Sequence, residues 1–261
     1  MNHFDLTEQY YSFDYQNVHF IALATEEEYL DMSNDKAKQQ LAFVKSDLEQ
    51  ASNNPNIDWI IPFFHRIMYA RQSAGVVDTY DHNLEDIYHP LFEQYGIKLV
   101  LQAHSHTYER TYPLRTNVED SKDPIITSKD LNNYYYNTDG LVIATIGTGG
   151  ATPTVFSTNS DYRAVEYREL YGFLNVEVSS DGTTLVGTFY ENDDNGGEGE
   201  IKDQFTITKS GAEDSSLLPP PPDLPIQQTD RTEEADADDT DSEGDEGGGD
   251  SGGDGGDGGG E

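Results

Sequence analysis

Apolar residues occur along the first 210 residues in two alternating patterns, one with helical spacing and one typical of buried strands. Over residues 35–50 they recur every three or four positions, which would make one helix face apolar (Ala37, Leu41, Val44 and Leu48). Short apolar runs bounded by turn residues predict strands at residues 10–15, 18–24, 59–64, 97–102, 141–146, 173–178, 184–190 and 204–208. The alternation of strands with helices predicts an α/β fold.

Proline and glycine mark where several of these elements end. A second helix is expected over residues 83–95, with Pro90 kinking or restarting it and Gly96 ending it. Asp181-Gly182 is typical of the turn of a β-hairpin, here between the strands at 173–178 and 184–190.

The composition changes at about residue 210. A run of four prolines at 219–222 favours an extended linker, and Asp, Glu, Gly and Ser dominate from there to Glu261. Such a segment has too few apolar side chains to offset the entropy of ordering, so residues 211–261 are predicted to be a disordered acidic tail. A calcium-binding interpretation of the tail is weaker, because no loop in it has the spacing of an EF-hand.

Charge and cysteine content exclude several classes of function. The formal net charge is −35, of which the tail carries −16 and the rest −19. A chain that is acidic throughout repels nucleic acid and anionic membranes, so neither is expected as a partner. There is no cysteine, which excludes disulfides, thiolate metal sites and cysteine nucleophiles. No apolar run approaches the roughly 18 residues of a membrane span.

Three of the seven histidines directly follow predicted buried strands. His65 follows the strand at 59–64, and His104 and His106 follow the strand at 97–102. Strand ends in an α/β sheet are where ligands bind, and imidazole suits zinc, iron, manganese and nickel. We therefore expect these three rings to point into one cleft as metal ligands, with His19 and His89 pointing elsewhere.

Four segments extend this pattern into a family resemblance. They resemble the purple acid phosphatase stretches Y-S-F-D-Y-G-x-V-H-F, G-H-R-P-M-Y, G-H-x-H-x-Y-E-R-T and G-T-G-G, at residues 10–21, 64–69, 103–111 and 147–150. The departures are Gln16, Phe64 and Ala103, each in place of glycine, and Ile67 in place of proline. Residues 1–210 thus resemble the C-terminal part of a calcineurin-like metallophosphoesterase domain.

The resemblance implies a fold and a set of ligands. The fold would be a four-layer α-β-β-α sandwich with two mixed sheets, here without its N-terminal half. His65 and His104 would bind one metal ion and His106 a second, in a pair of iron with zinc, manganese or iron. His82, in the interval between the first two, is the candidate substrate-side catalytic histidine.

Other residues of these motifs have less specific expectations. Arg66 and Tyr69 flank the first ligand and could contact substrate or only pack. Glu109 and Arg110 are expected to brace the loop rather than act in chemistry, and His19 and His89 to be structural.

The remaining ligands of the family come from the motifs D-x-G, G-D-x-x-Y and G-N-H-E, which belong ahead of the first of these segments and do not occur in the residues before Tyr10. Asn2-His3 echoes the last of them only by coincidence, because Phe4 stands where glutamate should follow. The resemblance therefore implies a site with half of its ligands missing and strands left uncovered, as in a truncated gene, a fragment or a misassigned start.

The implied function is hydrolysis of a small phosphate ester, most simply a monoester, impaired in the chain as written. One alternative is a phosphodiesterase or nucleotidase that uses the same metal ions. Another, from a different class, is an inactive remnant that serves as a binding or structural module. The family makes an extracellular location plausible, although the N-terminus is not a signal peptide.

Overall fold

The computed structural model describes residues 9–69, 84–130, 132–152, 160–192 and 199–209, together with the backbone of His3–Phe4. The predicted acidic tail and the candidate His82 lie outside the described residues. The helices are α1 (Glu27–Leu30), α2 (Asp35–Ser52), α3 (Leu84–Ile87) and α4 (His89–Gln94). No helix within the described ranges is long and apolar enough to cross a membrane.

A mixed sheet of eight strands forms the centre of the fold, in the order β1-β2-β3-β4-β5-β10-β6-β11. Its four middle strands, β3, β4, β5 and β10, run parallel, and antiparallel strands flank them on both sides. The strand bounds are β1 His3–Phe4, β2 Tyr11–Tyr15, β3 Val18–Ala22, β4 Trp59–Phe63, β5 Leu99–Gln102, β6 Tyr108–Thr111, β10 Val142–Ile146 and β11 Arg163–Tyr167.

A second mixed sheet has the order β12-β13-β14-β9. Three of its strands are antiparallel neighbours, and β9 is parallel to β14. Its bounds are β9 Tyr134–Tyr136, β12 Gly172–Val178, β13 Thr184–Glu191 and β14 Glu200–Thr208, and a separate pair consists of β7 Leu114–Arg115 and β8 Ile125–Ile126.

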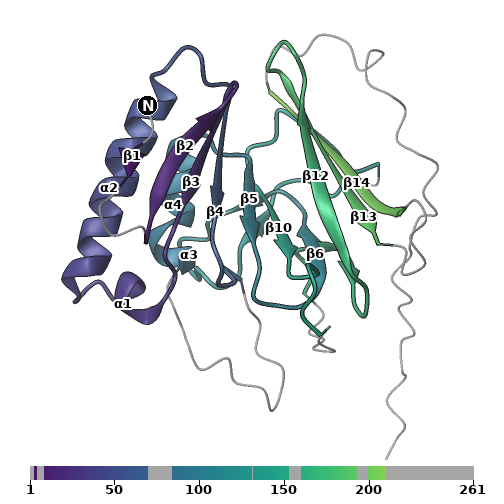
Figure 1. Ribbon diagram of the computed structural model, residues 1–261, viewed down its shortest axis with the longest axis horizontal. Helices are drawn as coiled ribbons and strands as arrows, with labels where there is room; N and C mark the ends of the chain where they lie inside the picture. The colour runs from purple at the N-terminus through teal and green to yellow at the C-terminus, as the bar shows by residue number, and fades with distance from the viewer. Residues whose placement is uncertain are drawn as a thin grey trace, which may run out of the picture. The chain divides into compact units, whose positions relative to one another are not determined.

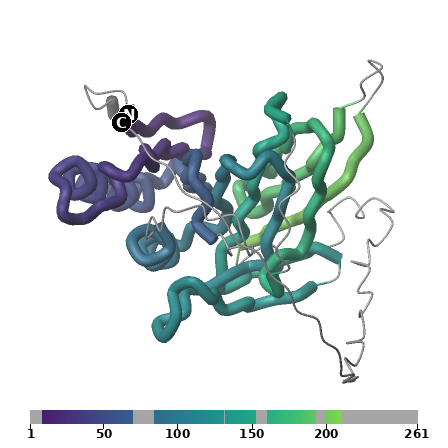
Figure 2. Tube along the Cα trace, turned by 90° about the horizontal axis from the view of Figure 1, so that it is seen from below, coloured from purple at the N-terminus to yellow at the C-terminus, as the bar shows by residue number. Residues whose placement is uncertain are grey.

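The two sheets and the helices form three layers (Figures 1 and 2). The helices cover one face of the large sheet, and the small sheet lies against the other face. Two apolar cores correspond to these contacts: one joins Val44 and Phe92 of the helices to Val100, and the other joins Trp59 to Phe205 across the sheets. Among the described residues no helix covers the outer face of the small sheet, so three of the four expected layers are present there.

Helices form over both ranges that the sequence predicts, α2 ends at Ser52, and α1 was not predicted. Asn34 caps α2, since its side-chain oxygen accepts a hydrogen bond from the backbone N–H of Lys36 at 3.0 Å. The helix expected over residues 83–95 is two short helices, and the second begins with Pro90 in its first turn. Gly96, with a φ of 66°, follows directly and ends the helical segment.

A buried ion pair joins the two sheets. The guanidinium of Arg110 on β6 donates to both carboxylate oxygens of Asp203 on β14, at 2.6 and 3.0 Å, and the two side chains are 0% and 2% exposed. Arg110 also donates to the Tyr135 hydroxyl on β9 at 2.7 Å, and Tyr108 donates to Asp203 at 2.7 Å. Although burial acts to lower it, the neighbouring Asp203 raises the pKa of Arg110, so the pair stays charged.

We predict that Asp203→Asn lowers the free energy of unfolding by about 3–5 kcal/mol, because it leaves the Arg110 guanidinium buried without its counter-charge. Urea unfolding followed by tryptophan fluorescence of Trp59 measures the change.

The matched control is Asp139→Asn, which removes the partner of Arg115 from an ion pair whose side chains are 84% and 50% exposed. Its effect should stay within about 1 kcal/mol. Equal losses in the two variants would show that the Arg110 pair does not hold the sheets together.

Candidate metal centre

The two histidine-bearing loops leave the large sheet at the same edge. Strands β4 and β5 are parallel neighbours, and His65 and His104 each stand two residues beyond the last residue of their strand. Because parallel strands end at one edge, the fold itself brings the two side chains together. His65 is exposed and His104 half-buried.

The rings of His65 and His104 have the spacing of two ligands of one ion. Nε2 of His65 lies 3.2 Å from Nδ1 of His104, and the ring centroids are 5.1 Å apart with the planes at 79°. Two nitrogens that each lie about 2.0–2.1 Å from one zinc-like ion, at a tetrahedral angle, are about 3.3 Å apart. The pair therefore fits a shared transition-metal ion.

His104 has an unusual backbone conformation. Its φ is 65°, a left-handed value that few non-glycine residues adopt. The backbone N–H of Ser105 donates to the carbonyl of Ala103 at 2.8 Å, which closes a three-residue turn around His104. Strained backbone of this kind concentrates at functional sites, where the surrounding structure holds a side chain in position.

His106 is placed by a different contact. Its Nδ1 lies 2.7 Å from the carbonyl oxygen of Thr152, so Nδ1 carries the proton and, in the neutral ring, the lone pair is on Nε2. Within the described ranges no group of three or more metal-binding side chains forms. The structure thus brings together His65 and His104, and the role of His106 remains a prediction.

Gly147 allows the His104–His106 loop to pack closely on the end of β10. A Cβ at position 147 would overlap the backbone carbonyl of Ser105, and the Gly147 N–H donates to the carbonyl of Thr107 at 3.1 Å. A glycine is therefore required here for close backbone approach, which explains the first residue of the Gly-Thr-Gly-Gly segment.

Tyr69, which the sequence left open between packing and substrate contact, is turned inward. It is 8% exposed, and its hydroxyl is hydrogen-bonded to Nδ1 of the fully buried His89. Tyr162 donates to the Tyr69 carbonyl at 3.2 Å. Burial raises the pKa of Tyr69 and lowers that of His89, so both groups are neutral and hold the loop after β4 in place.

Glu109 and Arg110 have different roles although they are adjacent. Glu109 accepts a hydrogen bond from Thr107 at 3.1 Å and pairs with Arg163 at 3.0 Å, so it braces the histidine loop as expected. Burial raises the pKa of Glu109, against the opposing effect of Arg163. Arg110 instead spans the two sheets, which the sequence did not indicate.

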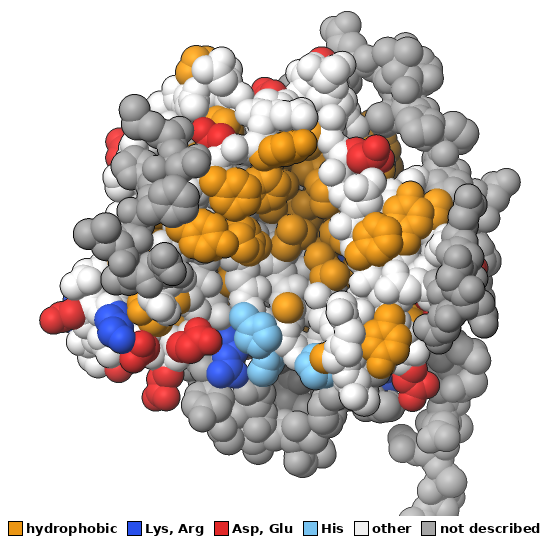
Figure 3. Space-filling model, in the orientation of Figure 1, with side chains coloured by type: hydrophobic (Ala, Val, Ile, Leu, Met, Phe, Trp, Pro, Cys, Tyr) orange, Lys and Arg blue, Asp and Glu red, His pale blue; other side chains and the backbone are white. Residues whose placement is uncertain are grey.

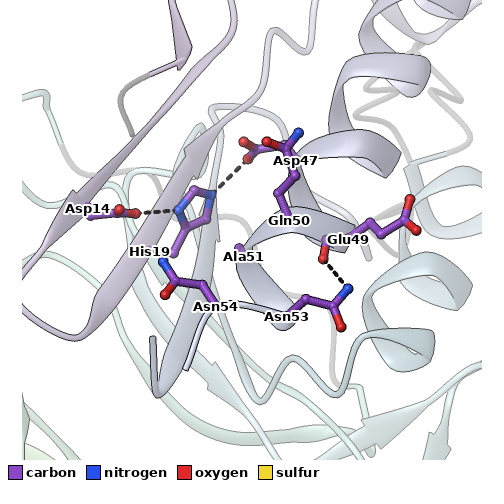
Figure 4. A pocket seen from close by; sticks show the side chains of 8 residues that line it. All are labelled: Asp14, His19, Asp47, Glu49, Gln50, Ala51, Asn53 and Asn54. Atoms are coloured by element: carbon purple, nitrogen blue, oxygen red, sulfur yellow. Dashed lines mark hydrogen bonds and ion pairs between the residues drawn. The ribbon is translucent and has the colours of Figure 1, made fainter. Parts of the chain in front are cut away.

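His19 lies apart from this centre, in a pocket of about 650 Å³ at the C-terminal end of α2 (Figure 4). Its Nδ1 contacts Asp14 of β2 at 2.6 Å, and its Nε2 contacts Asp47 of α2 at 2.8 Å. Ser12 donates to the other oxygen of Asp47 at 2.8 Å. His19 therefore ties the β2–β3 hairpin to α2, which agrees with the structural role expected of it.

Two carboxylates favour the protonated form of His19. Burial acts to lower its pKa, but the hydrogen bonds to Asp47 and Asp14 outweigh burial and raise it. For Asp14 burial acts to raise the pKa, and the hydrogen bond to His19 brings it below its ordinary value. Glu49 is the other acidic residue that lines the pocket.

We predict that His19→Gln destabilises the chain by about 1–3 kcal/mol in mild acid and by less in alkali. Because folding raises the pKa of His19, its contribution to stability is fully present below the pKa of the unfolded state, about 6.5. The contribution is lost as the pH rises through the pKa of the folded state. Because the pKa of Asp14 is lowered, its carboxylate stays ionised beside His19, and the contribution therefore persists down to about pH 4.

The measurement is urea unfolding of both chains at pH 5.5 and pH 8.5. A difference between wild type and variant that is the same at both values would mean that folding does not raise the pKa of His19.

Comparison with known proteins finds relatives that share part of this chain. No family model matches the chain. An uncharacterized protein of Mycobacterium tuberculosis is 28% identical over 241 residues, covering 77% of this chain and 45% of the relative. Human acid phosphatase type 7 is 33% identical over 120 residues, covering 40% of this chain and 26% of the relative. Other relatives are named acid phosphatase or probable inactive purple acid phosphatase.

The fold agrees with these relatives. The structure of purple acid phosphatase PPD1 from yellow lupin seeds superposes with a TM-score of 0.58 at 21% identity, covering 77% of this chain and 33% of that one. By its fold and its named relatives the chain is similar to calcineurin-like metallophosphoesterases of the purple acid phosphatase type. The chain spans less than half the length of each of these relatives.

Proposed function

We propose that this chain supplies the histidine side of a two-metal centre that hydrolyses phosphate esters, most simply monoesters. His65 and His104 would hold one metal ion, His106 the second, and His82 would face the substrate. The observation that carries the proposal is the 3.2 Å separation of the His65 and His104 nitrogens, with His104 in a strained turn at the edge of a parallel sheet.

The hydrogen bonds around the histidines support ligand roles. When bound, two metal ions position the phosphate and stabilise the charge that develops during in-line displacement. The histidines must be neutral to offer a lone pair, and the Thr152 carbonyl fixes the proton of His106 on Nδ1. His106 can therefore present Nε2 to an ion, because a carbonyl that accepts from one ring nitrogen commonly orients the other toward a metal.

An apolar surface that the described residues leave uncovered supports the further proposal that the carboxylate ligands come from a polypeptide segment outside these 261 residues. Four half-buried rings on the large sheet pack together with centroids 5.2–6.5 Å apart: Tyr11, Phe13, Phe20 and Phe63. Figure 3 shows apolar side chains gathered in the hollow between the two sheets, with histidine side chains at its lower edge.

This hollow also borders an open sheet edge. Among the described strands none pairs with the outer edge of β12, which is the end strand of the small sheet. A segment with alternating apolar side chains could pair with β12, cover the aromatic rings and end near the histidines. Such a segment would carry the D-x-G, G-D-x-x-Y and G-N-H-E motifs.

Two other functions remain to be separated from this one. A phosphodiesterase or nucleotidase would use the same ligands, and activity on diesters or nucleotides would identify it. A binding or structural module without activity would bind no metal ion at His65 and His104, and the family includes members named inactive.

We predict that the 261-residue chain hydrolyses a chromogenic phosphate monoester at least about 100-fold more slowly than a version extended upstream through the three missing motifs. Without them the second ion lacks ligands, and stabilising the transferring phosphoryl group is worth several powers of ten. Both proteins are assayed with zinc, manganese and iron.

His104→Ala in the extended protein should abolish turnover, whereas His19→Gln, assayed at a pH where it is folded, should leave turnover unchanged. The proposal is wrong if the 261-residue chain turns over as fast as the extended one and loses that activity with His104→Ala.

A further inference from the structure

We propose that Gln102 is a positioning residue that sets the distance between the His65 and His104 rings. This inference rests on the proposed function, because it concerns how the chain arranges the two ligands of one ion. Gln102 is the last residue of β5 and lies two positions before His104. Its side chain is buried in the interior, where it is 6% exposed.

The amide of Gln102 connects three segments that meet at this edge of the sheet. Its Oε1 accepts a hydrogen bond from the backbone N–H of Met68, in the loop that begins with His65, at 2.9 Å. Its Nε2 donates to the hydroxyl of Thr145 on β10, also at 2.9 Å. One side chain therefore fixes the His65 loop, the strand that leads to His104 and the strand that leads to Gly147.

The backbone pairing between β4 and β5 is too short to fix the relative positions of His65 and His104 firmly. Strands β3 and β4 pair at five positions and β5 and β10 at four, but β4 and β5 pair only through Phe63 and Leu101. Beyond that point two backbone bonds continue the contact: the N–H of Phe64 donates to Leu101 at 3.1 Å and that of Ala103 to His65 at 3.3 Å. The Gln102 bridge supplies the fixation that a longer ladder would otherwise provide.

Glutamine suits this position for a chemical reason. A buried backbone N–H such as that of Met68 requires an acceptor, and the Thr145 hydroxyl is satisfied at the same time by a donor. The amide offers both groups, one at each end of a rigid plane. The backbone N–H of Met68 can only donate, so the side-chain oxygen of Gln102, and not its NH₂ group, must face Met68.

The experiment compares Gln102→Met, which keeps the volume and removes both hydrogen bonds, with Gln102→Glu. A glutamate can accept from the Met68 N–H and from the Thr145 hydroxyl, so it keeps both links. The matched control is Gln204→Met, which removes a glutamine bond to the Thr188 hydroxyl, 3.0 Å long, in the small sheet.

Two readouts are used on the 261-residue chain. Cobalt(II) titration with visible absorption reports the affinity and geometry of the metal centre, with His104→Ala to show that the signal comes from it. In the metal-free chain, NMR cross-relaxation between ring protons of His65 and His104 reports whether the rings stay together.

We expect Gln102→Met to weaken cobalt binding about 10–100-fold, as is usual when hydrogen bonds that position a metal ligand are lost. It should also abolish the cross-peaks between the two rings. Gln102→Glu should keep the cross-peaks, and Gln204→Met should keep both signals. Cross-peaks that persist in Gln102→Met would overturn the inference, even if that variant is less stable.

The two proposals fail in different ways. If wild type shows no cobalt signal that depends on His104, the proposed metal centre is wrong, while the metal-free cross-peaks still decide the role of Gln102. If wild type binds cobalt and Gln102→Met binds it equally well with the same spectrum, the metal centre stands and the positioning role is wrong.

Discussion

The bidentate ion pair of Arg110 and Asp203 is the contact on which the arrangement of the two sheets depends. Each charge is removed from water, a cost of several kcal/mol that only close geometry can offset. The geometry is close: Arg110 makes three hydrogen bonds, Tyr108 adds a fourth to Asp203, and the ring of Phe205 lies 5.1 Å below the guanidinium. A displaced small sheet would leave two charges buried and unpaired, so only one relative position of the sheets is stable.

That fixed position has a consequence at the metal centre. Arg110 lies on β6, and β6 begins two residues after His106. Tyr108, also on β6, stacks on Phe189 of the small sheet with centroids 3.8 Å apart. The histidine loop is therefore anchored on one side by β5 and on the other by a strand that is locked between the sheets. The left-handed conformation of His104 can persist because both ends of its loop are held.

The sequence predicted the parts of this structure that depend on local patterns. The long helix α2, the buried strands, the restart at Pro90 and the placement of His65 and His104 at strand ends all follow from periodicity and turn chemistry. The strands β6 and β11 were not predicted, because Tyr108–Thr111 and Arg163–Tyr167 carry charged residues that mask the apolar alternation. Their charges are paired only in three dimensions, as Glu109 with Arg163.

Long-range partners were likewise beyond the reach of the sequence. Asp203 lies 93 residues from Arg110, and both stand among polar neighbours that give no sign of their burial. Gln102 offers a signal, because it directly follows the apolar residues Leu99 to Leu101 of a buried strand, and it is 6% exposed. Such residues must have partners, because an unpaired buried polar group costs about 1–3 kcal/mol.

The acidity of the chain bears on how a phosphate ester could reach the histidines. A net charge of −35 repels an anion at long range, but at physiological salt charges act mainly within about 8 Å. Under the proposed function, the charge close to the histidines therefore matters more than the net charge, and Arg66 directly follows His65 in the sequence. Apolar side chains fill the hollow above the histidines, and both acidic and basic side chains lie beside the histidines at its lower edge (Figure 3). An ion pair formed against low-dielectric walls is stronger than one in water, so under the proposed function a small number of positive charges at the histidines would suffice to bind a phosphate ester on an acidic protein.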